Sequence, residues 1–153
     1  MNAKLIIDTN ILVAAMRNRD EPAFALLQQV RAGNAVMCCS TALFLEYEDV
    51  LMRPEHLMAS GLAEADVHEI LAELASLVAP VLTHYQWRPQ LRDPADEMVL
   101  EAAVNGGAGI IVTYNLKDFA PSKLFGILTL NPAQTFNHLS LTRNPSTNRS
   151  APS

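Results

Sequence analysis

Four acidic residues stand where this chain passes from an apolar segment toward a helical one. Asp8 directly follows the apolar run 5–7, and three further acids lie at similar junctions or in the first turns of a helical pattern. The four are Asp8, Glu46, Asp96 and Asp118. Open parallel sheets bind their ligands outside the carboxyl ends of the strands. We therefore expect four carboxylates to converge on one end of one sheet.

Carboxylates gathered in this way favour a divalent metal ion. Mg²⁺ typically takes one or two carboxylates and completes its shell with water and substrate phosphate. In phosphodiester hydrolysis such ions orient and deprotonate the attacking water and stabilise the leaving oxygen. Without an ion the clustered negative charges would raise one another's pKa values, so divalent metal is expected to stabilise the protein.

The elements that must position these acids alternate between strand and helix patterns. Short apolar runs predict strands at residues 4–7, 35–39, 81–84, 109–113 and 127–130. Apolar residues at helical spacing predict helices at residues 11–16, 22–32, 41–52, 63–78, 98–104 and 132–139. This alternation is typical of a parallel sheet covered on both faces. Right-handed crossovers then place every strand-to-helix loop at the same end of the sheet.

The length and composition fit one compact domain. The chain has 153 residues, of which 50% are hydrophobic, and at this length folding buries roughly two-thirds of the unfolded surface. We assign residues 1–140 to this domain. Residues 141–153 are rich in Asn, Pro, Ser and Thr without apolar periodicity, so this tail is expected to be disordered.

Charge and cysteine content narrow the class of protein. A net charge of −5 argues against coating nucleic acid through bulk positive charge, but a bound divalent ion would reverse the local field, so RNA is not excluded. The adjacent Cys38 and Cys39 lie in an apolar run and are interpreted as packing residues. The sequence has no signal-peptide pattern and no run near the ~18 apolar residues of a membrane span. A cytoplasmic protein without membrane association is therefore expected.

Four motifs give the chain a resemblance to a known family. They are IDTN at 7–10, LEYEDVLMRP at 45–54, RDPAD at 92–96 and VTYNLKDF at 112–119. In this order, over about residues 5–132, the chain resembles PIN-domain proteins, specifically the VapC-like ribonuclease toxins of bacterial toxin–antitoxin systems. The resemblance implies a three-layer α/β/α Rossmann-like fold with a central, mostly parallel sheet. It further implies an endoribonuclease that depends on Mg²⁺ or Mn²⁺, forms a homodimer and is inhibited by an antitoxin protein.

The resemblance also assigns roles to single positions. Asp8, Glu46 and Asp96 match the first three metal-binding and catalytic acids of the family. Asp118 matches the fourth, in an Asn-x-x-Asp-Phe variant of the last motif. Many relatives carry Gly-Asp directly after the threonine of that motif, where this chain has Tyr114-Asn115, so either Asn115 or Asp118 completes the site. The expected supporting or substrate-contacting residues are Thr9, Asn10, Thr113, Asn115, Arg92 and Lys117.

Other interpretations remain open for the same residues. An Asp that follows a strand or precedes a helix often caps the helix, and Asp93 before Pro94 fits a cap better than a ligand. A haloacid-dehalogenase-like phosphatase also begins with an Asp after a strand, but it needs a second Asp two residues later, where Asn10 stands. A non-catalytic PIN scaffold that binds RNA or a partner protein is the third reading, which the Tyr114-Asn115 variation keeps open.

Overall fold

The computed structural model describes residues 2–82, 91 and 93–143. The strands are β1 (Lys4–Ile7), β2 (Val36–Ser40), β3 (Ala79–Val81), β4 (Ile110–Val112) and β5 (Leu128–Leu130). The helices are α1 (Thr9–Arg17), α2 (Pro22–Arg31), α3 (Thr41–Leu51), α4 (Pro54–Ser60), α5 (Glu64–Leu77), α6 (Pro94–Gly106), the 3₁₀ helix η1 (Leu116–Phe125) and α7 (Pro132–Arg143).

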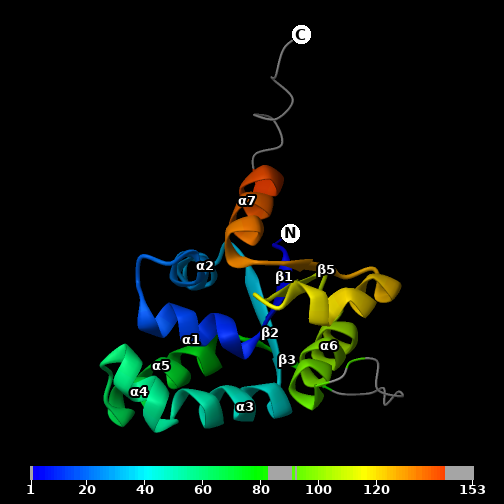
Figure 1. The fold of residues 1–153 in the computed structure, drawn as a ribbon. Coiled ribbons are helices and arrows are strands. Elements are labelled where there is room, and N and C mark those ends of the chain that lie inside the picture. The colour runs from blue at the N-terminus through cyan, green and yellow to red at the C-terminus, as the bar shows by residue number, and fades with distance from the viewer. Residues whose placement is uncertain (1, 83–90, 92, 144–153) are drawn as a thin grey trace.

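The strands form one parallel sheet in the order β3-β2-β1-β4-β5. Helices α1 and α2 lie on one side of the sheet and α6 lies on the other, so the fold is the expected three-layer α/β/α arrangement (Figure 1). The chain order reverses between the neighbours β1 and β4, whose last residues, Ile7 and Val112, are paired. In sheets of this kind ligands bind at this reversal, beyond the carboxyl ends of the strands.

Two short apolar runs form the centre of the core. The side chains of Leu5, Ile6 and Ile7 are fully buried, and all three side chains of β4 are buried as well. Because both faces of a central parallel strand are covered, such strands are continuous hydrophobic runs rather than alternating ones. The two strands predicted from these apolar runs are therefore confirmed.

Helix α6 packs closely against the sheet and carries Asp96 near its first turn. Near its carboxyl end, a Cβ atom added to Gly106 would lie 2.7 Å from Cγ2 of Val81 in β3, so any other residue here would force the Val81 side chain to move. Gly107 then ends the helix with a left-handed φ of 63°, a conformation that glycine adopts without strain. The helix predicted at residues 98–104 is thus present, but it begins earlier, at Pro94, and continues through Gly106.

Other elements also differ from the prediction made from sequence. Helix α3 ends at Leu51, close to the predicted end at residue 52, but the sequence patterns did not predict the additional helix α4 that follows. Pro54 occupies the first turn of α4, where the missing backbone N–H of proline removes no helical hydrogen bond. Strand β3 covers residues 79–81 instead of 81–84, and residues 83 and 84 lie outside the described part. Between β4 and β5, where the sequence patterns predict neither a strand nor a helix, the chain forms the 3₁₀ helix η1.

The C-terminal region is only partly described. Helix α7 continues through Arg143, beyond the predicted helix end at residue 139 and the predicted domain boundary at residue 140. The remainder of the expected tail, residues 144–153, lies outside the described residues.

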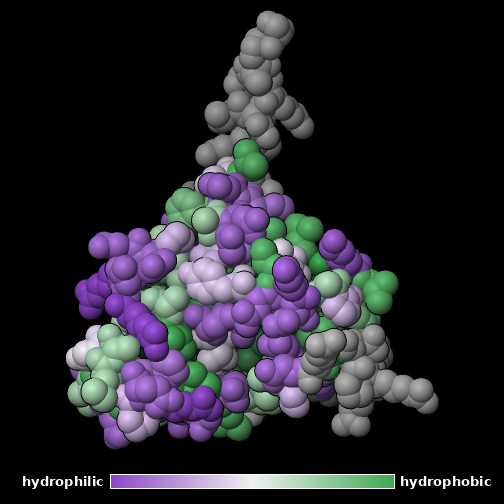
Figure 2. Space-filling model, in the orientation of Figure 1, coloured by the Kyte–Doolittle hydropathy of each residue, from purple (hydrophilic) through white to green (hydrophobic). Residues whose placement is uncertain are grey.

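The surface in the view of Figure 2 is largely polar, with hydrophobic side chains over the η1 and β5 region at the right of the view. Leu124 is 81% exposed there, and Phe125 and Leu128 are also exposed. No helix in the described ranges is long and apolar enough to cross a membrane.

Candidate active site

Asp8 stands at the point where the chain order of the sheet reverses. Its backbone N–H donates to the carbonyl oxygen of Val112 in β4 at 2.9 Å, and its side chain is 8% exposed. The Thr113 hydroxyl, fully buried, donates to Oδ2 of Asp8 at 2.7 Å. The same hydroxyl oxygen accepts from the backbone N–H of Asn115 at 3.0 Å. Because the Thr113 oxygen accepts this bond, the Thr113 hydroxyl hydrogen is free to be donated to Asp8. The Asp8 carboxylate is thus oriented from the β4 side.

The environment of Asp8 opposes its ionisation. Burial raises the pKa of the Asp8 carboxyl above its ordinary value, and the negative charge of Asp93 adds to this effect. The Thr113 hydroxyl and the backbone amides of Thr9 and Asn10 favour the ionised form and partly offset the rise in pKa. The carboxylate is thus held in place by hydrogen-bond donors, and no positive side chain in the described part of the chain lowers its pKa.

Asp96 approaches from the opposite layer, in the first turn of α6. The carboxylate of Asp93 caps this helix by accepting from the N–H of Ala95 at 2.9 Å, which confirms the predicted capping role of Asp93. Asp96 is 8% exposed, and its pKa is raised to about 6. The largest cause is burial, followed by the negative charges of Asp8, Asp93 and Asp118. Asp8 and Asp96 therefore lie close enough to repel each other.

No positive side chain among the described residues offsets this repulsion. The ion pairs found there join Arg31 to Glu73 and Arg53 to Asp49, and neither includes Asp8 or Asp96. Two buried carboxylates of like charge without a counter-charge are costly for a fold, and groups in such surroundings cluster at functional sites.

The other two predicted acids hold different positions. Asp118 is exposed in the first turn of η1, and its charge acts on Asp96 from there. Glu46 is half-buried in the middle of α3 and is not among the charges that shift the pKa of Asp8 or Asp96. Within residues 2–82, 91 and 93–143, no three His, Cys, Asp or Glu side chains are arranged closely enough to hold a metal ion. The structure thus brings Asp8 and Asp96 together with Asp93 and Asp118 around them.

The predicted supporting residues lie around the same edge, except where the chain is not described. Thr9 and Asn10 form the start of α1, and Asn115 and Lys117 are exposed at the start of η1. The side-chain oxygen of Asn10 is buried and lacks a hydrogen-bond partner among the described residues. Arg92 lies outside the described residues.

The donor set at this edge fits a hard divalent cation. The groups available are the carboxylate oxygens of Asp8 and Asp96, with the negative charges of Asp93 and Asp118 nearby. Oxygen ligands of this kind suit Mg²⁺ and Mn²⁺ rather than metals that prefer sulfur or imidazole. A cation there would also reverse the field that raises the pKa values of both carboxyls.

One residue close to this site was not found from the sequence. Tyr47 follows Glu46 in α3, its side chain is fully buried, and its hydroxyl donates to the carbonyl oxygen of Ile7, directly before Asp8. The only signal in the sequence is a tyrosine at an apolar helical position. The pattern predicts burial for such a residue, but it does not reveal the partner of its hydroxyl.

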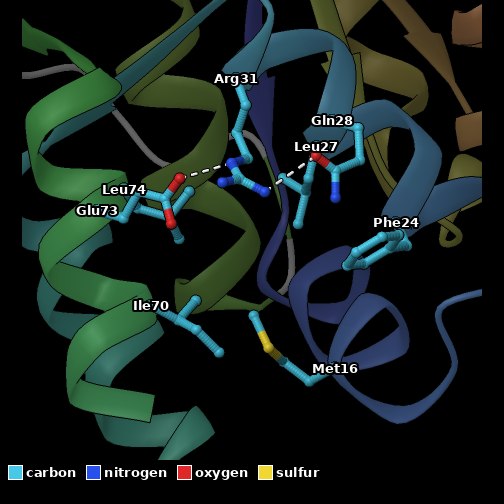
Figure 3. A pocket seen from close by; sticks show the side chains of 8 residues that line it. All are labelled: Met16, Phe24, Leu27, Gln28, Arg31, Ile70, Glu73 and Leu74. Atoms are coloured by element: carbon cyan, nitrogen blue, oxygen red, sulfur yellow. Dashed lines mark hydrogen bonds and ion pairs between the residues drawn. The ribbon is translucent and has the colours of Figure 1, made fainter. Parts of the chain in front are cut away.

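A separate pocket lies between α1, α2 and α5 (Figure 3). It contains none of the residues Asp8, Asp93, Asp96 and Asp118. Its volume is about 100 Å³. It is lined by Met16, Phe24, Leu27, Gln28, Arg31, Ile70, Glu73 and Leu74. Arg31 and Glu73 form an ion pair across it, and the other lining side chains are mostly apolar. Its walls present no nucleophile or paired acids, so we place the chemistry at the sheet edge.

Comparisons with known proteins identify the family and the fold of this chain. A sequence profile of the PIN domain matches residues 4–117, and the chain therefore belongs to the PIN-domain family. Members of this family are typically nucleases that use divalent metal ions. A search of curated proteins found no match.

A solved structure shares the fold. It is the crystal structure of VapBC2 from Rickettsia felis bound to a DNA fragment from their promoter. The matched chain is 16% identical, with a TM-score of 0.57, and the alignment covers 84% of this chain and 98% of that one. At this identity the likeness extends to the fold and confirms the three-layer architecture.

Proposed function

We propose that this protein is an endoribonuclease that depends on Mg²⁺ or Mn²⁺ and acts as the toxin of a toxin–antitoxin pair. The observation that carries the proposal is the pair Asp8 and Asp96, two buried carboxylates that repel each other at the reversal point of a PIN-domain sheet. A fold that only needed stability would replace one of them with a neutral side chain. Both are retained because the site binds a cation.

The proposed division of roles follows the positions of the side chains. Asp8 and Asp96 hold the ion, and Glu46 and Asp118 complete its acidic surroundings, with Asn115 as the alternative to Asp118. A bound ion would neutralise the scissile phosphate and supply an activated water for in-line attack. Thr113 keeps the Asp8 carboxylate in one orientation. Lys117, exposed on η1, contacts the RNA phosphates together with Arg92.

A toxin role requires an inhibitor, and the partner we propose is an antitoxin protein. The solved structure that shares the fold is VapBC2 from Rickettsia felis bound to a DNA fragment from their promoter, and the resemblance of this chain to VapC-like toxins makes an antitoxin the expected partner. We also propose that this chain forms a homodimer in a cytoplasmic setting. Light scattering on the purified protein, alone and with the product of the adjacent gene, measures both assemblies.

The decisive experiment is RNA cleavage by purified protein in the presence of Mn²⁺ or Mg²⁺. Loss of a charged metal ligand removes several kcal/mol of transition-state stabilisation, so Asp8→Asn is expected to lower cleavage by about 1,000-fold. EDTA should abolish cleavage by the wild type. Glu64→Gln, at an exposed position of α5, is the matched control and should cleave as the wild type does. Cleavage that survives Asp8→Asn would refute the proposal.

The same assay tests a non-catalytic PIN scaffold. The observation in favour of a scaffold is that no three acids among the described residues form a metal-holding group. A scaffold would bind RNA or a partner protein equally with and without Mn²⁺ and would leave RNA intact. RNA binding without cleavage in wild type, unaffected by EDTA, would select this second function.

A further inference from the structure

The peptide that joins Ile7 to Asp8 fixes where the Asp8 side chain starts. This peptide is planar and trans, so its N–H and its carbonyl point to opposite sides of the strand. The N–H of Asp8 donates to Val112 on the β4 side. The carbonyl of Ile7 consequently points toward the β2 side of β1.

On the β2 side, the described strands supply no backbone partner for this carbonyl. The paired residues of β1 and β2 end at Ile6 and Cys38, one residue before Ile7, and β2 then continues alongside β3. A buried carbonyl without a partner is costly, and almost all such groups find a donor. Here the donor is a side chain, the hydroxyl of Tyr47 from α3.

Tyr47 is held firmly enough to serve as this donor. Its side chain is fully buried, and its ring meets that of Phe44, one turn earlier in α3, edge-on at 6.2 Å between centroids. The Cys39 side chain lies within hydrogen-bonding reach of the Tyr47 hydroxyl. The negative charge of Asp8 also acts on the hydroxyl, which shows how near the two side chains are.

We propose that Tyr47 is a positioning residue of the metal site, which fixes the Ile7–Asp8 peptide from the β2 side while β4 and Thr113 fix Asp8 from the other. This inference rests on the proposed metal-dependent activity and adds to it a residue that touches neither metal nor substrate. Residues that orient metal ligands typically change metal affinity or activity by about 10-fold to 100-fold when their hydrogen bond is removed. The expected effect of losing the Tyr47 hydroxyl lies in this range.

The test is direct Mn²⁺ binding, measured by calorimetry on the full chain, with RNA cleavage as a second readout. Tyr47→Phe removes one oxygen and should weaken Mn²⁺ binding by about 10-fold or more. The KM for RNA should stay unchanged, and the kcat lost at low Mn²⁺ should return at high Mn²⁺. A change in melting temperature without a change in Mn²⁺ affinity would mean a structural role only and would overturn the inference.

A matched control separates site effects from general loss of a buried hydrogen bond. Thr135 is also fully buried, and its hydroxyl donates to the backbone carbonyl of Asn131 at 2.8 Å, at the start of α7. Thr135→Val removes this bond with little change in shape and should lower stability while leaving Mn²⁺ affinity unchanged. Equal losses of Mn²⁺ affinity in both variants would contradict a specific role for Tyr47.

A second variant keeps the test valid if Tyr47→Phe does not fold. Replacement of Tyr47 by 4-aminophenylalanine keeps an N–H donor at the same place, so Mn²⁺ affinity should stay within roughly threefold of the wild type, well short of the loss expected without a donor. A 10-fold loss in this variant would overturn the inference. Absence of Mn²⁺ binding and cleavage in the wild type would instead refute the proposed function, so the two failures are distinguishable.

Discussion

Two pairs of charged side chains are treated in opposite ways by this fold. Arg31 and Glu73 are of opposite charge, meet at 2.5 Å between Nε and Oε1, and are about half exposed at the rim of the pocket between α2 and α5. Asp8 and Asp96 are of like charge, and each is 8% exposed at the edge of the sheet. Solvent screens the first pair, so it contributes little to stability. Burial strengthens the repulsion within the second pair, so it lowers stability.

The difference indicates which part of the molecule serves function. The attractive pair, Arg31 and Glu73, is exposed, where it adds little to stability. The repulsive pair, Asp8 and Asp96, is buried, where it lowers stability most. Groups whose pKa values are raised by burial and by neighbouring charges are concentrated at sites that bind ions or do chemistry. Each of the following predictions changes one member of the comparison, beginning with the largest effect.

Asp96→Asn should separate stability from activity. The neutral amide removes the repulsion with Asp8, so we expect a higher free energy of unfolding in EDTA, measured with urea. Because the variant also loses a metal ligand, RNA cleavage with Mn²⁺ should fall by about 1,000-fold. Glu69→Gln, an exposed acid on α5, should change neither quantity. An Asp96→Asn protein that cleaves RNA as well as the wild type would remove Asp96 from the site.

Mn²⁺ should stabilise the wild type through the same pair of carboxylates. A ligand at 100 times its Kd stabilises the folded state by about 2.7 kcal/mol, which corresponds to roughly 5–10 °C in Tm for a chain of this size. Asp96→Ala should lose this shift, as measured by differential scanning fluorimetry with and without Mn²⁺. Equal shifts in both proteins would mean that the ion binds elsewhere.

The pH dependence of stability should report the raised pKa of Asp96. Its folded-state pKa, about 6, lies above the ordinary value of 3.8, so its stabilising contribution is complete below about 3.8 and is lost as the pH rises through 6. In EDTA, the free energy of unfolding should therefore fall more steeply between pH 4.5 and 7 in the wild type than in Asp96→Asn. Parallel pH profiles of the two proteins would show that Asp96 has an ordinary pKa.

The sequence predicts the positions of Asp8 and Thr113 better than it predicts the hydrogen bond that fixes the Ile7–Asp8 peptide. Apolar runs before Asp8 and before Thr113 identify two neighbouring strands, because fully buried parallel strands leave continuous hydrophobic segments. The right-handed crossover rule then places both residues at the same end of the sheet. Helix α4 escapes prediction because proline both ends helices and begins them, and only tertiary packing decides between these outcomes.

The hydrogen bond from Tyr47 could not be predicted. Its partner is a backbone carbonyl 40 positions earlier in the chain, and a backbone group has the same identity at every residue. The need for a side-chain donor arises because β1 and β2 stop pairing at Ile6, which depends on the packed geometry of three strands. The roles of Glu46 and Asp118 remain predictions, because their assignment rests on motif matches and on the effect of Asp118 on Asp96.

The smallest expected effect belongs to the exposed ion pair. Arg31→Gln should lower the free energy of unfolding by less than about 1 kcal/mol, because both side chains are screened by water and lose side-chain entropy when they pair. Glu73→Gln should give a similar value, and the double variant should cost no more than either alone. None of the three should alter the Mn²⁺ response. A loss of several kcal/mol in Arg31→Gln would contradict this ranking. It would mean that the methylene groups of Arg31 stabilise the protein by packing against the apolar walls of the pocket. Burial of neighbouring groups, rather than charge, would then distinguish the two regions.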